Sequence, residues 1–103
     1  MIAATNENIN ALLDSNETVL LDFYAPWCGP CKVVMPMLES MESEMSHVKF
    51  AKVDVDSEKG IAERYGIMSV PTIVILRNGK EIGRGSGING INPLIAKLRE
   101  GTL

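Results

Sequence analysis

The chain has 103 residues, of which 46% are hydrophobic, and a formal net charge of -3 at pH 7. This length predicts one domain with a single core over residues 1–103. The ten basic residues are dispersed, which argues against a nucleic-acid or anionic-membrane surface. No apolar run approaches the ~20 residues of a membrane span, and the first residues lack the features of a signal peptide, so we expect a cytoplasmic protein.

The first half of the chain predicts alternating strands and helices. A short edge strand over residues 2–4 precedes a helix over 6–15, in which apolar residues recur at helical spacing. A continuous apolar run over 19–24 is typical of a buried strand, and the period then changes to that of a helix from Lys32 onward. A further strand over 48–55 completes a β-α-β unit, which implies parallel strands.

Two more helices are expected in the second half. Ser57 is a good N-cap for a helix that ends near Gly66. The last helix is expected to begin with Asn92 as N-cap and Pro93 in its first position, and to end at Gly101.

Between these helices the sequence predicts a β-hairpin. Two predicted strands, over 72–76 and 81–84, flank Asn78-Gly79, the strongest short signal for a hairpin turn. The predicted architecture is therefore an α/β fold in which four helices flank a mixed five-stranded sheet.

Cys28 and Cys31 are the only cysteines, and a Cys-x-x-Cys spacing has three common interpretations. A zinc site requires about four ligands, and His47 is the only histidine, so one chain cannot complete it. A structural bridge over so short a loop removes little entropy from the unfolded chain. A redox-active pair is the interpretation that the composition favours, without a metal.

The two cysteines are expected at a strand-to-helix junction. Free N–H groups and the positive end of a helix dipole favour a thiolate there. Cys28, at the tip, is therefore predicted to be the acidic and exposed thiol, and Cys31 the more buried one. Pro30 is tolerated in the first turn of the helix, where its missing N–H costs nothing.

A carboxylate at Asp22 interrupts the buried strand. Such a group is disfavoured unless it reaches water or is used, and burial would raise its pKa so that it exchanges a proton near neutral pH. Lys52, between Ala51 and Val53 in the neighbouring strand, is the candidate countercharge, or alternatively a surface lysine whose stem alone is covered.

The segment from Gly85 to Gly90 matches G-x-G-x-x-G, which is typical of dinucleotide binding after a parallel strand. Too few residues follow it for the rest of such a unit. We interpret these glycines as a sheet-to-helix turn with bare backbone.

The motifs in this order resemble the thioredoxin family along essentially the whole chain. They are Asp22-Phe23-Tyr24-Ala25-Pro26-Trp27-Cys28-Gly29-Pro30-Cys31-Lys32, Val53-Asp54-Val55-Asp56, Val70-Pro71-Thr72 and Asn78-Gly79. Two positions depart from the pattern. Tyr24 stands where the family often has Trp, and Met68 stands where many members carry Arg, which bears on the choice of partner.

The resemblance implies a thioredoxin fold and a protein-disulfide reductase. Cys28 would attack a substrate disulfide and Cys31 would resolve the mixed disulfide, with Asp22 as proton acceptor and Lys52 beside it. A cis Val70-Pro71 bond would face the cysteines, and Val70 would pair with substrate backbone. The substrate rim would comprise Trp27, Gly29, Pro30, Val70, Pro71, Gly87 and Ile88.

The resemblance also implies partners. A monomer would act on protein disulfides without a bound cofactor, and a thioredoxin reductase supplied by NADPH or ferredoxin would reduce it again. The rival hypothesis is a binding subunit that docks through the same rim while its thiols are incidental.

Overall fold

The computed structural model describes residues 1–14 and 17–103 of the chain. Within them, five strands form one sheet in the order β1-β3-β2-β4-β5, and four helices flank it, which confirms the predicted fold class. The strands are β1 (Ile2–Ala3), β2 (Thr18–Tyr24), β3 (Val48–Asp54), β4 (Thr72–Arg77) and β5 (Lys80–Ser86). The helices are α1 (Ile9–Leu13), α2 (Cys31–Glu44), α3 (Lys59–Arg64) and α4 (Gly87–Glu100).

The sheet is mixed because its connections are of two kinds. The long crossover through α2 makes β2 and β3 parallel, as expected of a β-α-β unit. The Asn78-Gly79 turn makes β4 and β5 antiparallel, and both turn residues have positive φ, 55° and 77°, as a tight hairpin requires. The central strand β2 pairs with β3 on one side and with β4 on the other.

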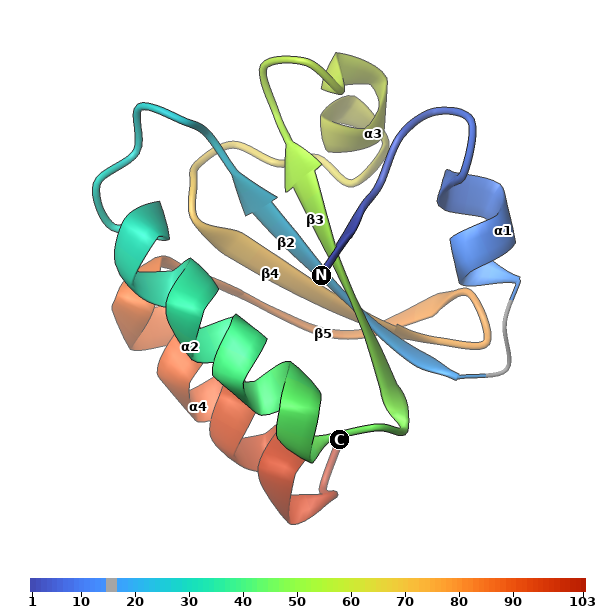
Figure 1. Ribbon diagram of the computed structural model, residues 1–103, viewed down its shortest axis with the longest axis vertical. Coiled ribbons are helices and arrows are strands. Elements are labelled where there is room, and N and C mark those ends of the chain that lie inside the picture. The colour runs from blue at the N-terminus through green and yellow to red at the C-terminus, as the bar shows by residue number, and fades with distance from the viewer. Residues whose placement is uncertain (15–16) are drawn as a thin grey trace.

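Helices cover both faces of the sheet. Figure 1 shows α2 and α4 side by side on one face, and α1 and α3 on the other. Two apolar cores result, one under each layer. Alternate residues of β2 enter alternate cores, with Leu20 beneath α2 and α4 and Leu21 on the opposite face.

The observed starts of α1 and α3 differ from those predicted. The helix predicted over 6–15 is shorter, since α1 spans Ile9–Leu13, and its predicted end at Ser15 lies outside the described residues. Ser57 does not cap α3, so that prediction is wrong. Its N–H donates to Oδ1 of Asp54 at 3.4 Å, within a turn that delays the helix, and Glu58 takes the cap position without a side-chain hydrogen bond.

The predicted start of the last helix is also wrong. The structure begins α4 at Gly87 rather than at Asn92, and Pro93 lies inside the helix. The reason is Gly87, whose φ of 67° lets the chain turn from β5 directly into the helix. The predicted end is confirmed, because Gly101 caps α4 with a φ of 74°.

The glycine-rich segment at this junction is a packing feature. A Cβ placed on Gly85 would lie 2.7 Å from the carbonyl carbon of Gly90 and 3.2 Å from the N of Ile91. The strand β5 and the first turn of α4 therefore approach each other backbone to backbone. Glycine at position 85 allows this contact and fixes how α4 leaves the sheet.

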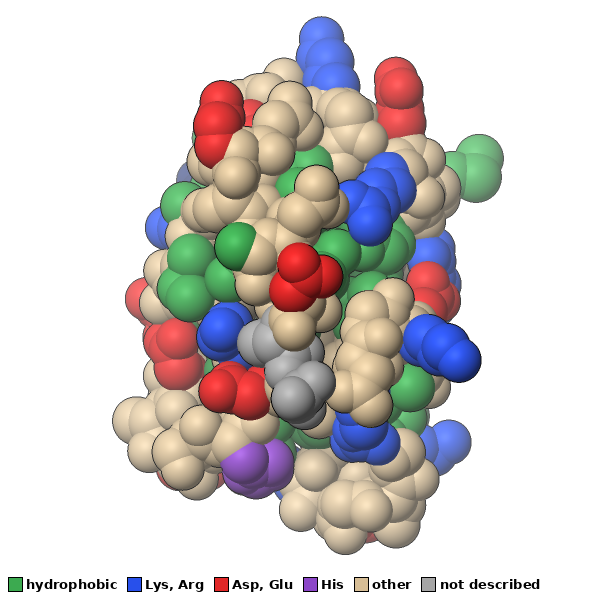
Figure 2. All heavy atoms as spheres, turned by 90° about the vertical axis from the view of Figure 1, so that its right-hand side faces the viewer, with side chains coloured by type: hydrophobic (Ala, Val, Ile, Leu, Met, Phe, Trp, Pro, Cys, Tyr) green, Lys and Arg blue, Asp and Glu red, His purple; other side chains and the backbone are tan. Residues whose placement is uncertain are grey.

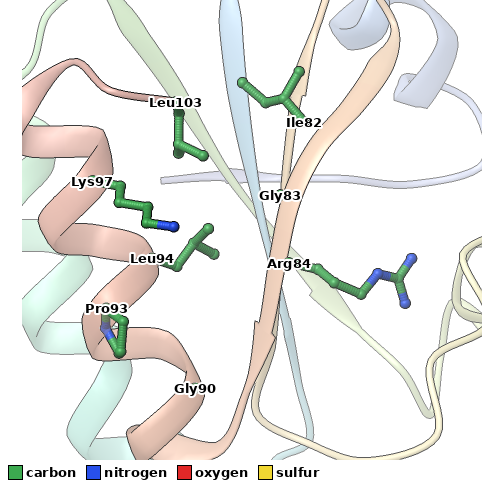
Figure 3. A pocket seen from close by; sticks show the side chains of 8 residues that line it. All are labelled: Ile82, Gly83, Arg84, Gly90, Pro93, Leu94, Lys97 and Leu103. Carbon is green, nitrogen blue, oxygen red and sulfur yellow. The ribbon is translucent and has the colours of Figure 1, made fainter.

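Further along the same interface lies a pocket of about 260 Å³ between β5 and α4. Figure 3 shows Leu94 and Leu103 in the space between helix and strand, and Arg84 on the opposite side of the strand. A Cβ on Gly83 would lie 2.8 Å from Cδ1 of Leu94, which is the far end of a flexible side chain. Gly83 thus borders side chains that can move, whereas Gly85 borders backbone.

The outer surface carries charges of both signs. On the face shown in Figure 2, acidic and basic side chains are interspersed. Among the described residues, none of the helices has the length and apolar character needed to cross a membrane.

We predict that Gly85→Ala destabilises the protein far more than Gly83→Ala. The Gly85 methyl group would collide with backbone atoms of Gly90, and overpacking of this kind costs about 1 to 3 kcal/mol or more. At Gly83 the ends of Leu94 and Leu103 can turn away. Urea unfolding of the two variants measures the difference, and equal losses would contradict the backbone contact.

Candidate active site

The loop after β2 brings the two cysteines together. Cys28 and Cys31 form a disulfide, and their Cα atoms lie 5.4 Å apart. With Ala25 they make a small apolar cluster against which Tyr24, Val55 and Val70 pack. The helix α2 begins at Cys31, and Pro30 takes the cap position just before it rather than the first turn.

A hydrogen bond distinguishes the two sulfur atoms. The backbone N–H of Cys31 donates to Sγ of Cys28 at 3.2 Å, so Cys28 lies at the positive end of α2. The prediction that Cys28 is the exposed member is wrong, because in the disulfide Cys28 is 3% exposed and Cys31 4%. Both residues are buried among neighbouring apolar side chains, so exposure does not distinguish them.

Asp22 is buried beneath the cysteine helix. It is 1% exposed and, by the alternation of β2, faces the same side of the sheet as Leu20, toward α2. Neither carboxyl oxygen has a hydrogen-bond partner among the described residues. Burial raises the pKa of Asp22 from 3.8 to about 7, and the positive charge of Lys52 partly opposes the rise. The interpretation of Asp22 as an acid that reaches water is therefore wrong.

Lys52 lies directly opposite Asp22 in the β2–β3 register and is half-buried. Cα partners in a sheet present their side chains to the same face, so the predicted countercharge is near the carboxyl group and acts on it through space. Tyr24 lies on this face too, and burial together with the charges of Asp54 and Asp22 raises the pKa of its hydroxyl.

The loop before β4 and the start of α4 meet beside the disulfide. Figure 1 shows the β2–α2 loop, the loop before β4 and the β5–α4 junction at the same end of the sheet. The Val70-Pro71 bond is cis, as expected, and Val70 packs against the cysteine cluster. The N–H of Gly87 donates to the carbonyl oxygen of Pro71 at 2.9 Å, and the adjacent Ile88 is 40% exposed.

Trp27, just before Cys28, lies open to solvent. Its side chain is 71% exposed, yet its Nε1–H donates to Oδ2 of Asp56 at 2.9 Å, which fixes the ring. Gly29 and Pro30 are both exposed. A Cβ on Gly29 would meet nothing within 4 Å.

Two pockets flank the disulfide. One of about 170 Å³ is lined by Tyr24, Ala25, Pro26, Cys31, Lys32 and Met35. The other, of about 190 Å³, is lined by Trp27, Val55, Ile67, Met68, Ser69 and Val70. Of this second set, the sequence did not predict Val55, Ile67 and Ser69 as site residues. The available signal was their position, since Val55 directly follows β3, and Ile67 and Ser69 lie just before Val70.

Among the residues that the structure describes, no group of three or more His, Cys, Asp and Glu side chains could hold a metal ion.

We predict that Asp22 makes the oxidised protein less stable as the pH rises from about 4 to 7. In this interval the native carboxyl group keeps its proton while the unfolded one, with a pKa of 3.8, has lost it. The native state therefore binds more protons, and its stability falls with rising pH. Asp22→Ala should remove this loss, which for such a shift amounts to roughly 4 kcal/mol at pH 8. Denaturant unfolding at pH 4 and pH 8 measures it.

The matched variant is Lys52→Gln. Because the Lys52 charge opposes the raised pKa of Asp22, removing it should extend the loss of stability to higher pH. A difference between Asp22→Ala and the parent protein that is the same at both pH values would contradict a buried, protonated Asp22.

Comparison with known proteins agrees with this geometry. The family model described as thioredoxin matches residues 1–100. A thioredoxin of Chlamydia caviae is 42% identical over 94 residues, which cover 91% of each chain. The crystal structure of Fasciola hepatica thioredoxin is 37% identical with a TM-score of 0.84, over 99% of this chain and 96% of that one.

A third match comes from a structural study of the thiol-resolving mechanism in a yeast mitochondrial 1-Cys peroxiredoxin via glutathione/thioredoxin systems. The matching chain is 31% identical with a TM-score of 0.87, and the match covers 97% of this chain and 94% of that one. The family match over nearly the whole sequence, joined to a Cys28–Cys31 disulfide at the start of α2, shows that the chain belongs to the thioredoxin family of disulfide oxidoreductases.

Proposed function

We propose that this protein reduces disulfides in protein substrates through dithiol-disulfide exchange at its Cys28-Gly29-Pro30-Cys31 segment. The observation that carries the proposal is the hydrogen bond from the Cys31 N–H to Sγ of Cys28. In the reduced protein this donor and the dipole of α2 favour a thiolate at Cys28, and the thiolate is the nucleophile in disulfide exchange.

The exchange has two steps. The Cys28 thiolate attacks one sulfur of the substrate disulfide and forms a mixed disulfide, while the other substrate sulfur leaves as a thiolate that takes up a proton. Cys31 then loses its proton and attacks Sγ of Cys28. This breaks the mixed disulfide, releases the second substrate thiol and leaves the Cys28–Cys31 disulfide. Neither step needs a bound cofactor.

Asp22 is the proposed proton acceptor for Cys31. It lies beneath the helix that Cys31 begins, and a pKa of about 7 suits a base that works near neutral pH. Its oxygens have no partner among the described residues, so they are open to a water molecule that could relay the proton. Lys52 would keep the pKa of Asp22 from rising further.

The substrate would dock along the loop before β4. No hydrogen bond involving the Val70 backbone is formed by the described residues, so this backbone is open to an extended substrate segment. Pro71 and Gly87, joined by their hydrogen bond, would hold this loop in place. The remaining rim, made of Trp27, Gly29, Pro30 and Ile88, offers apolar contact with few side chains, which favours broad specificity.

The oxidised protein must be reduced again. We propose a thioredoxin reductase supplied by NADPH or ferredoxin, with this chain acting as a monomeric, single-domain electron carrier over residues 1–103. The glutathione/thioredoxin systems named for the yeast neighbour support a role of this kind. A reducing cytoplasm is the compartment that suits a lone catalytic cysteine pair.

We predict that Cys31→Ser traps substrates as stable mixed disulfides. The attacking Cys28 remains in this variant, whereas the thiol that resolves the intermediate is absent. Non-reducing gels after incubation with a disulfide-containing protein measure the trapped fraction.

The matched control is Cys28→Ser, in which the remaining thiol lacks the hydrogen bond at the helix start and should trap far less. Equal trapping by the two variants would contradict the assigned roles. Replacing both cysteines by serine tests the rival hypothesis, because a binding subunit would keep its biological role and a reductase would lose it.

We predict that Asp22→Ala slows the second step more than the first. Loss of a general base slows proton transfer by about 10² to 10⁴. Attack by Cys28 should change little, because its acidity is set by the start of α2. Stopped-flow measurement of mixed-disulfide formation and decay separates the steps, and normal decay in the variant would rule out the proton-acceptor role.

A further inference from the structure

Beside the disulfide lies an apolar pocket that borders the solvent. Its volume of about 190 Å³ is smaller than the ~300 to 1,000 Å³ of small-molecule sites, which suits a single side chain. Its lining residues are Trp27, Val55, Ile67, Met68, Ser69 and Val70. Two of them, Val55 and Val70, also pack against the Cys28–Cys31 cluster. The pocket is therefore continuous with the site of exchange.

Met68 lines the solvent-facing edge of this pocket. Its side chain is 97% exposed, although it lies beside other apolar groups. The remaining methionines are covered to a greater extent: Met41 and Met45 are buried, and Met1, Met35 and Met37 are half-buried. Met68 is thus the methionine that a dissolved oxidant reaches first.

The thioether of methionine reacts with hydroperoxides. The sulfur attacks the terminal peroxide oxygen, the O–O bond breaks, and the products are the sulfoxide and water or an alcohol. The sulfur is oxidised by two electrons and the peroxide is reduced by two. The reaction turns a flexible apolar group into a polar one.

We propose that Met68 is an oxidation site that controls an apolar subsite for substrate. This rests on the proposed function, because the occupant is a substrate side chain next to the disulfide under attack. An aliphatic side chain there would contact Trp27, Val55 and Val70 and cover Met68. With the sulfoxide in place, the same substrate side chain would cover a strongly polar S–O group and remove it from water, so substrates with an apolar flanking residue are disfavoured.

The first measurement is the site of oxidation. The oxidised, disulfide-bonded protein is treated with hydrogen peroxide, digested, and analysed by mass spectrometry. Sulfoxide should appear in the Met68 peptide well before it appears at Met35 or Met37, and last at the buried Met41. Equal or faster oxidation of the half-buried methionines would overturn the assignment.

The second measurement is substrate preference. Peroxide-treated and untreated proteins are reduced with dithiothreitol, freed of it, and mixed in single-turnover experiments with two peptide disulfides. The peptides differ only in having Leu or Gly beside the cysteine. Oxidation should lower the second-order rate constant for the Leu peptide about tenfold, the size of effect that a lost apolar pocket contact produces. The rate constant for the Gly peptide should change little.

The matched variant is Met68→Leu. Whatever its starting rates, they should be the same before and after peroxide, which excludes damage at Trp27 or the cysteines as the cause. A Met68 sulfoxide that leaves the ratio of Leu to Gly peptide rates unchanged would overturn the subsite. Failure of the untreated protein to reduce either peptide would instead overturn the proposed function and the subsite with it.

Discussion

The burial of β2 on both faces is the constraint on which the site depends. Two helix layers cover this strand, and β3 and β4 pair with its two edges, so it has no route to water along most of its length. That enclosure desolvates Asp22 and raises its pKa. The buried strand also fixes where the chain enters α2, at whose start the Cys31 N–H donates a hydrogen bond to Sγ of Cys28. One strand thus sets the electrostatic surroundings of both Asp22 and Cys28.

Elements with a local signal were predictable from the sequence. Asn78-Gly79 dictates its hairpin by backbone conformation alone, and the apolar run before Pro26 indicates a strand buried on both faces. The start of α4 was not predictable in this way. Asn92 and Pro93 are good local helix starters, but Gly87 and the close approach of Gly85 to Gly90 begin the helix earlier. This contact joins the backbones of two glycines. Glycine has no side chain, so the hydrophobic pattern of the sequence carries no signal for the contact.

The residues that gather at the site are more predictable from the sequence than its shape. Asp22, Cys28 and Pro71 stand out because a buried acid, a close cysteine pair and a proline in an apolar run each conflict with their surroundings. The pocket around Met68 comes from loops that follow β2, β3 and α3, whose positions depend on how the layers pack. The burial of Cys28 is not predictable from the sequence for a similar reason, since Val55 and Val70, which help to cover the pair, reach it from distant parts of the chain.

The open space beside Gly29 has a consequence for how such a protein can evolve. A side chain added there meets no neighbour, and the adjacent Pro30 already lies at the surface. The dipeptide between two exchanging cysteines lies where it can influence the relative stability of thiol and disulfide. Selection can therefore retune the equilibrium between reductant and oxidant at this dipeptide while the core beneath it, and the folding of the chain, remain as they are.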